Sequence, residues 1–146
     1  MNQRLRITTI TVLSTLSSLI LLAAGLAKSI NYSNFYDSLS QWHILRTGTI
    51  ATLAAMVPFI EIILSLLWLL NVKRTVLNYL ISGMLIAYTI AIVTEHKVSG
   101  NVECHCFSFI QSGSESKELV WYIARNTALC LPFILLGFFS YKDEHQ

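Results

Sequence analysis

Long apolar runs, separated by short polar segments, dominate the chain. Four runs are long enough to cross a bilayer, at about residues 7–27, 49–70, 76–94 and 121–141. A helix needs about 20 such residues to cross a hydrocarbon core about 30 Å thick. Apolar residues occur all round each predicted helix, which is typical of membrane spans. Because a helix satisfies its own backbone hydrogen bonds in lipid, the pattern predicts an all-α, polytopic membrane protein with a four-helix transmembrane bundle.

The composition supports a membrane protein. Of the 146 residues, 54% are hydrophobic and only 12% are charged, whereas soluble domains carry about 25% charged residues. The mean hydropathy is +0.59. A formal net charge of +2 is too small for a nucleic-acid partner. Four spans use nearly the whole chain, so we expect one transmembrane domain over residues 1–146, in contact with the lipid bilayer and without a separate soluble domain.

The first apolar run admits a second interpretation. Arg4 and Arg6 precede it and small residues follow it, as in a cleaved signal peptide. However, the run is longer than the 7–15 apolar residues of a usual signal peptide. We therefore expect an uncleaved first span.

The distribution of Lys and Arg predicts the orientation. The segments before the first span, between the second and third, and after the fourth carry Arg4, Arg6, Lys73, Arg74 and Lys142. Cationic residues mark the cytoplasmic side. The other side carries as many cations, but they are spread over two longer loops. We expect a multi-pass protein of the bacterial cytoplasmic (inner) membrane, with both termini cytoplasmic and the loop at 95–120 outside.

The first outer loop predicts a short helix. Ser33 or Asn34 is a suitable N-cap, and Phe35, Leu39 and Trp42 then fall on one face. This face is either an aromatic anchor at the membrane surface or a lid over a site between the helices. The other aromatic residues near span ends are expected at the interface; they are Trp68, Tyr79, Trp121 and Tyr122.

The second outer loop carries Cys104, His105 and Cys106. Extracytoplasmic compartments permit disulfides. A disulfide across one intervening residue closes a small, strained ring, and strained disulfides exchange readily. A protonated His105 would favour the reactive thiolates. The functional interpretation is a redox pair; the alternative is a structural pair or two unrelated thiols.

A metal site is the second functional interpretation of this loop. Cys104, Cys106 and His96 offer thiolate and imidazole ligands, which suit zinc or copper. Their spacing does not match a closed structural zinc site. Cys130, within the fourth span, is expected to be a packing residue.

Glu61 lies deep within the second span, shortly after Pro58. A carboxylate at that depth costs several kcal/mol unless it is paired or neutralised. Candidate partners are Lys28 at the end of the first span and Arg125 at the start of the fourth, and Tyr88 is a candidate hydrogen-bond donor. The resulting polar cluster is either a structural ion pair or part of a proton or redox site.

Several short motifs follow one another along the chain. They are A-G-L-A-K at 24–28, V-P-F-I-E at 57–61, C-H-C-F at 104–107 and A-R-N at 124–126, with Phe35 after the first. Their order resembles the MauE (methylamine utilisation) branch of the DoxX-like four-span membrane proteins. Members of that family have G-x-x-K, P-x-x-E, C-G-C-F-G and R-[ND] at these places, so the resemblance covers nearly the whole chain.

The resemblance implies roles for particular residues. Lys28, Glu61 and Arg125 match the family's membrane-embedded charged positions, and Cys104 and Cys106 match its paired cysteines. MauE is associated with maturation of a disulfide-rich periplasmic dehydrogenase subunit, which implies a redox-associated membrane protein. This chain reads C-H-C-F-S where the family has C-G-C-F-G, so both glycines are lost. The resemblance does not carry the methylamine substrate over.

Three functions follow as hypotheses. The first is a redox-associated accessory protein for thiol–disulfide exchange or maturation of extracytoplasmic proteins, in which Cys104 and Cys106 exchange a disulfide with a partner protein. The sequence leaves open whether such a protein is itself an enzyme, a thiol–disulfide oxidoreductase. The electrons would then pass either to a quinone or to a membrane thiol carrier, and the sequence is compatible with both acceptors. The second is a metal-handling or transport component that uses Cys104, Cys106 and His96. The third is a structural subunit of a membrane complex.

Overall fold

The computed structural model describes residues 3–99 and 115–144. The described elements are five helices: α1 (Gln3–Ile30), α2 (Tyr32–Ser40), α3 (Thr47–Leu69), α4 (Arg74–Ser99) and α5 (Glu115–Glu144). Four of them contain a segment long and apolar enough to cross a membrane, at Thr8–Ile30, Gly48–Leu69, Arg74–Val98 and Leu119–Phe138. The prediction of an all-α, four-span membrane protein is confirmed.

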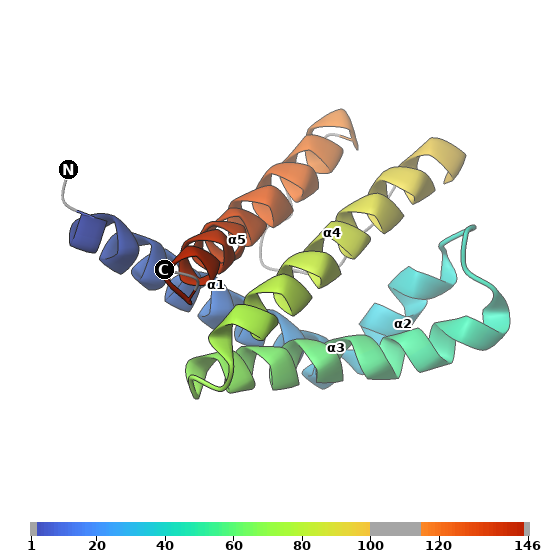
Figure 1. Ribbon diagram of the computed structural model, residues 1–146. Coiled ribbons are helices and arrows are strands. Elements are labelled where there is room, and N and C mark those ends of the chain that lie inside the picture. Colours follow the sequence, from blue (N-terminus) through green and yellow to red (C-terminus); the bar gives the residue numbers. More distant parts are fainter. Residues whose placement is uncertain (1–2, 100–114, 145–146) are drawn as a thin grey trace.

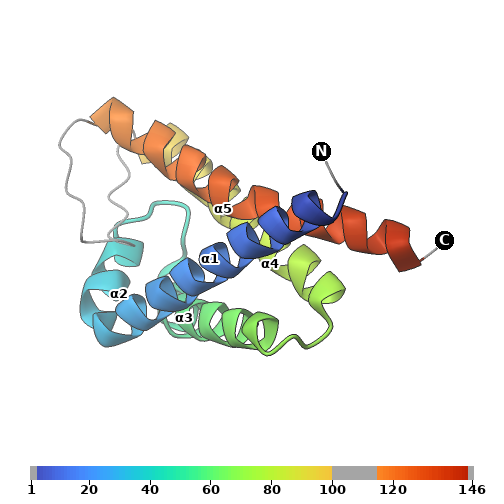
Figure 2. The ribbon, with the colours of Figure 1, turned by 90° about the vertical axis from the view of Figure 1, so that its left-hand side faces the viewer.

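The long helices associate in pairs. Helix α1 packs along α3, and α4 packs along α5, while α1 also contacts α5 and joins the two pairs (Figure 1). The short helix α2 packs on α3. The beginning of α1 and the end of α5 lie at the end of the bundle opposite α2 (Figure 2), as an even number of spans requires.

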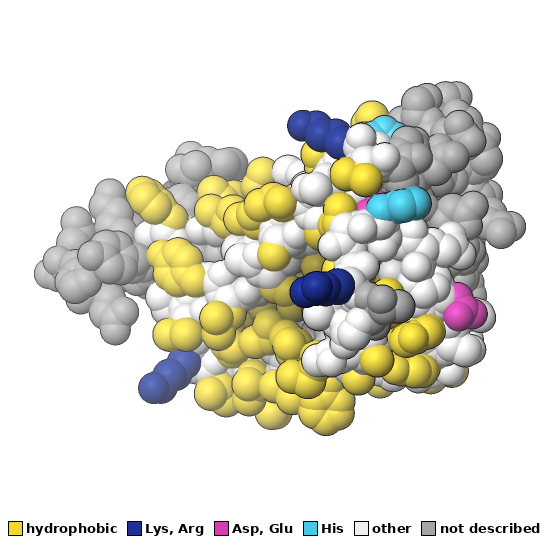
Figure 3. All heavy atoms as spheres, turned by 90° about the vertical axis from the view of Figure 1, so that its right-hand side faces the viewer, with side chains coloured by type: hydrophobic (Ala, Val, Ile, Leu, Met, Phe, Trp, Pro, Cys, Tyr) yellow, Lys and Arg dark blue, Asp and Glu magenta, His cyan; other side chains and the backbone are white. Residues whose placement is uncertain are grey.

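The outside of the bundle is apolar. Large side chains on all four long helices are exposed, among them Leu16 (52%), Phe59 (64%), Ile90 (62%) and Phe138 (68%). Figure 3 shows hydrophobic side chains spread over much of one face. Water would penalise such a surface, whereas lipid does not. This surface therefore fits a bilayer environment.

Small residues let α1 and α3 approach closely. A Cβ placed on Gly25 would stand 3.1 Å from the Pro58 carbonyl oxygen and 2.9 Å from Ile62 Cγ1. Further along the same contact, the Ser18 hydroxyl donates to the Ser65 carbonyl over 3.2 Å. Small residues and interhelical hydrogen bonds are the usual means by which helices associate in lipid.

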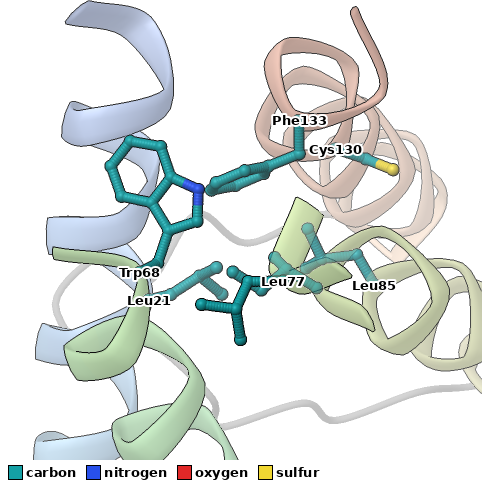
Figure 4. Close-up of a cluster of buried hydrophobic side chains, with 7 residues drawn as sticks. Leu21, Trp68, Leu77, Leu85, Cys130 and Phe133 are labelled. Atoms are coloured by element: carbon teal, nitrogen blue, oxygen red, sulfur yellow. The ribbon is translucent and has the colours of Figure 1, made fainter. Parts of the chain in front are cut away.

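The apolar core lies where α1, α3, α4 and α5 meet. It is formed by Leu21, Trp68, Leu77, Ile81, Leu85, Cys130 and Phe133 (Figure 4). Trp68 is fully buried, packs edge-on against the Phe133 ring, and donates from Nε1 to Asn78 Oδ1 over 2.7 Å. Trp68 lies one residue before the end of its span, but its side chain is turned into the bundle, where its N–H finds a partner. Cys130 packs in the same cluster, with Sγ 3.8 Å from the Ser82 carbonyl oxygen.

Helix α2 begins earlier than its capping pattern predicts. Neither Ser33 nor Asn34 is the N-cap; Asn31 precedes the helix, and its side chain makes no capping hydrogen bond. Instead, the Asn31 backbone N–H and side-chain amide both donate to the Ala27 carbonyl, so hydrogen bonding runs on from the end of α1. The aromatic face of α2 is turned inward, with Phe35 and Leu39 buried against α3, and Trp42 follows the helix.

Candidate functional site

A buried ion pair joins α1 to α3. Lys28 Nζ lies 2.5 Å from Glu61 Oε1, and the two side chains are only 7% and 2% exposed. Of the two candidate cations, the structure therefore brings Lys28 into contact with Glu61. In a buried environment each charge stabilises the other, and removal of one would leave an unpaired charge.

The close approach at Gly25 positions this pair. Gly25 lies one helical turn before Lys28, and a Cβ there would stand 3.2 Å from Glu61 Cβ. The backbone of α3 is also held at this level, because the Ser65 hydroxyl donates to the Glu61 carbonyl over 2.7 Å. A larger residue at position 25 would separate the helices that the ion pair connects.

Aromatic rings surround the Lys28 ammonium. Nζ lies 5.6 Å from the centre of the Phe35 ring on α2 and 5.4 Å from that of Tyr88 on α4. Both distances fit cation–π contacts, which stabilise a cation removed from water. Four elements thus meet at Lys28, and α2 covers it.

Glu61 keeps one oxygen free of hydrogen bonds. Oε1 accepts from Lys28, but Oε2 is buried and, within the described residues, accepts no hydrogen bond. A buried carboxylate oxygen without a donor is costly. It is therefore a strong acceptor for a molecule that brings a hydrogen.

A cavity of about 280 Å³ lies beside this pair. Lys28, Glu61 and Arg125, the three charged residues singled out in the sequence, all line it, together with Tyr88 and Asn126. The rest of its wall is apolar: Ile20, Leu21, Ala24, Phe35, Leu39, Trp42, Ile44, Leu45, Leu53, Val57, Leu85, Ala87, Ala91, Ile92 and Leu129. The Arg125 guanidinium lies 5.5 Å from the centre of the Tyr122 ring.

Glu95 holds the connection between α2 and α3 against α4. Its Oε1 accepts from the His43 backbone N–H over 3.0 Å and lies 3.2 Å from His43 Nδ1, while Oε2 accepts from the Ile44 N–H over 3.2 Å. Trp42 and Ile44, on either side of His43, line the cavity. The sequence pattern placed residue 95 at the start of the outer loop, whereas α4 continues to Ser99 and Glu95 is buried within it.

The paired cysteines and His105 lie outside the described residues. His96 lies near the end of α4 and is half-buried. Over residues 3–99 and 115–144, no three His, Cys, Asp or Glu side chains come together as a metal site would require.

A comparison with protein families agrees with the motifs. The family described as methylamine utilisation protein MauE matches residues 6–140. Comparisons with curated proteins and with solved structures find no match. The match spans nearly the whole chain and includes all four membrane-spanning segments. The chain therefore belongs to the MauE family and is a multi-pass membrane protein.

Proposed function

We propose that this protein is a membrane accessory protein in extracytoplasmic thiol–disulfide exchange, with Cys104 and Cys106 as the redox pair. The Cys104–Cys106 disulfide would accept two electrons and two protons and become two thiols, while a dithiol of the partner protein becomes a disulfide. The observation that carries the proposal is membership of the MauE family over residues 6–140, in a chain that keeps a C-x-C pair between its third and fourth spans.

The arrangement of the helix ends supports this proposal. Glu95 is bonded to the connection between α2 and α3, so α4 ends beside the elements that cover the cavity. Cys104 follows Ser99, the last residue of α4, by five positions. An extended chain covers at most about 3.6 Å per residue. In sequence, the redox pair thus closely follows the helix that Glu95 connects to the residues of the cavity wall.

The buried polar residues would serve the redox pair in this proposal. Glu61 and Lys28 would hold or pass protons below the loop, and Arg125 would stabilise negative charge there. The family description names methylamine utilisation. The partner in this proposal would be an extracytoplasmic protein that carries the dithiol. The cysteine loop would face outward from a bacterial inner membrane, with both termini in the cytoplasm.

Thiol labelling tests the proposal. Intact cells that carry the protein are treated with a membrane-impermeant thiol reagent, with and without prior reduction, and the mass shift is read at Cys104 and Cys106. Labelling only after reduction is expected. Cys104→Ser and Cys106→Ser should each abolish oxidation of the partner, whereas Cys130→Ser, inside the core, should leave it intact. Full activity of Cys104→Ser, or labelling only after cell lysis, would overturn the proposal.

A further inference from the structure

The wall of the cavity beside Lys28 includes residues whose buried polar atoms have no hydrogen-bond partner among the described residues. Glu61 Oε2, from α3, is a free acceptor, and Trp42 Nε1, after α2, is a free donor; neither has a hydrogen-bond partner among the described residues. An unsatisfied buried polar group costs about 1–3 kcal/mol, and folded proteins rarely leave one without a reason. A ligand that brings both a donor and an acceptor would satisfy the pair.

The size and walls of the cavity limit the ligand. A cavity of about 150 Å³ lined by apolar side chains holds benzene, so a volume of about 280 Å³ leaves space for a six-membered ring with a few substituents. Phe35, Trp42 and Tyr88 contribute aromatic walls, which favour a flat ring. Lys28, Glu61 and Leu129 all lie within membrane-spanning segments, so the ligand is soluble in lipid.

The free Glu61 oxygen favours a ligand group that carries a hydrogen. Lys28 and Glu61 neutralise each other, and the Arg125 guanidinium, which faces the Tyr122 ring, is the remaining charge in the wall. An anionic ligand at Oε2 would add a second negative charge beside the Glu61 carboxylate and would supply no hydrogen. A neutral hydroxyl group supplies the hydrogen without that repulsion.

From these observations we infer that the cavity binds a lipid-soluble hydroquinone, an aromatic ring that carries two hydroxyl groups. One hydroxyl donates its hydrogen to Glu61 Oε2, and the oxygen of the other hydroxyl accepts the Trp42 Nε1 hydrogen. The aromatic side chains of the wall hold the ring. This inference goes beyond the proposed thiol chemistry and does not depend on Cys104 or Cys106.

Calorimetric titration of the full chain in detergent micelles tests the site without any variant. The probe is tert-butylhydroquinone; its dimethyl ether has the same ring without hydroxyl hydrogens, and decanoate is an anionic comparator. We expect saturable binding of the hydroquinone and at least about tenfold weaker binding of the ether, as the loss of a buried hydrogen bond predicts. Equal binding of the ether, stronger binding of decanoate, or no saturable binding of the hydroquinone would overturn the inference.

A pair of variants places the binding in this cavity. Ala91→Phe fills the cavity from α4, whereas Ala55→Phe adds the same group to the exposed face of α3. Hydroquinone binding should fall at least about tenfold in the first variant, because the added ring removes the space for the ligand, and should stay unchanged in the second. Unchanged binding by a folded Ala91→Phe protein would contradict the site. The titration contains no thiol partner, so its failure would leave the disulfide proposal standing.

Discussion

Gly25 lies directly against Glu61: a methyl group on Gly25 would stand 3.2 Å from Glu61 Cβ and 3.1 Å from the Pro58 carbonyl oxygen. The second of these atoms belongs to the backbone of α3 and cannot turn aside. The absence of a side chain at Gly25 is therefore what allows α1 and α3 to come close enough for Lys28 to reach Glu61.

Gly25→Ala should destabilise the bundle, although alanine is the better helix former. The added methyl must push α1 from α3, and overpacking of this kind costs about 1–3 kcal/mol. The measurement is the thermal unfolding midpoint in detergent. The matched control is Gly83→Ala in α4, where a Cβ meets nothing within 4 Å; its midpoint should stay the same or rise. Equal midpoints for both variants would refute the role given to Gly25.

Either single replacement of the ion pair, Lys28→Met or Glu61→Leu, should be strongly destabilising. Each leaves an unpaired buried charge, which costs about 3–5 kcal/mol. The double variant should recover much of the loss, because it leaves no charge behind. The free energies of unfolding of the four proteins form a double-mutant cycle. Additive losses would show that Lys28 and Glu61 do not stabilise each other.

Glu95→Ala should loosen the connection between α2 and α3. It deprives the His43 and Ile44 N–H groups of their acceptor, at a cost of about 1–3 kcal/mol. Hydrogen exchange at these two amides should become faster. His43→Ala is the control: its side chain is 66% exposed, its backbone N–H is retained, and exchange should change little. Unaltered exchange in Glu95→Ala would mean that Glu95 does not hold this connection.

Trp68→Phe should destabilise the core more than its small change in volume suggests. The variant removes the N–H that pairs with Asn78 Oδ1 and leaves the buried amide without its partner, a loss of about 1–3 kcal/mol. Trp121→Phe removes the same group from a residue that is 54% exposed and should shift the unfolding midpoint little. A larger shift for Trp121→Phe would contradict this assignment.

Local polarity was sufficient to predict the four spans, because the preference of a 20-residue helix for lipid depends mainly on its own composition. Local polarity also identified Glu61 as a candidate site residue, because an acid within an apolar run is unusual whatever its neighbours in space are. The motifs at 24–28, 57–61 and 124–126 pointed to the family for the same reason: they are short and local.

The contacts between residues of different helices depend on how each helix is rotated about its axis and on the angle at which two helices cross. Only the tertiary structure determined these contacts. Lys28 and Arg125 were equal candidates for Glu61 until the contact at Gly25 brought α1 against α3. The sequence placed Trp68 near the end of its span, but only the packing showed that its side chain turns into the bundle. The same holds for Phe35, which turned inward over Lys28, and for Glu95, whose hydrogen bonds reach residues more than 50 positions away. Such contacts depend on the packing of whole helices, which no local pattern of hydrophobic and polar residues contains.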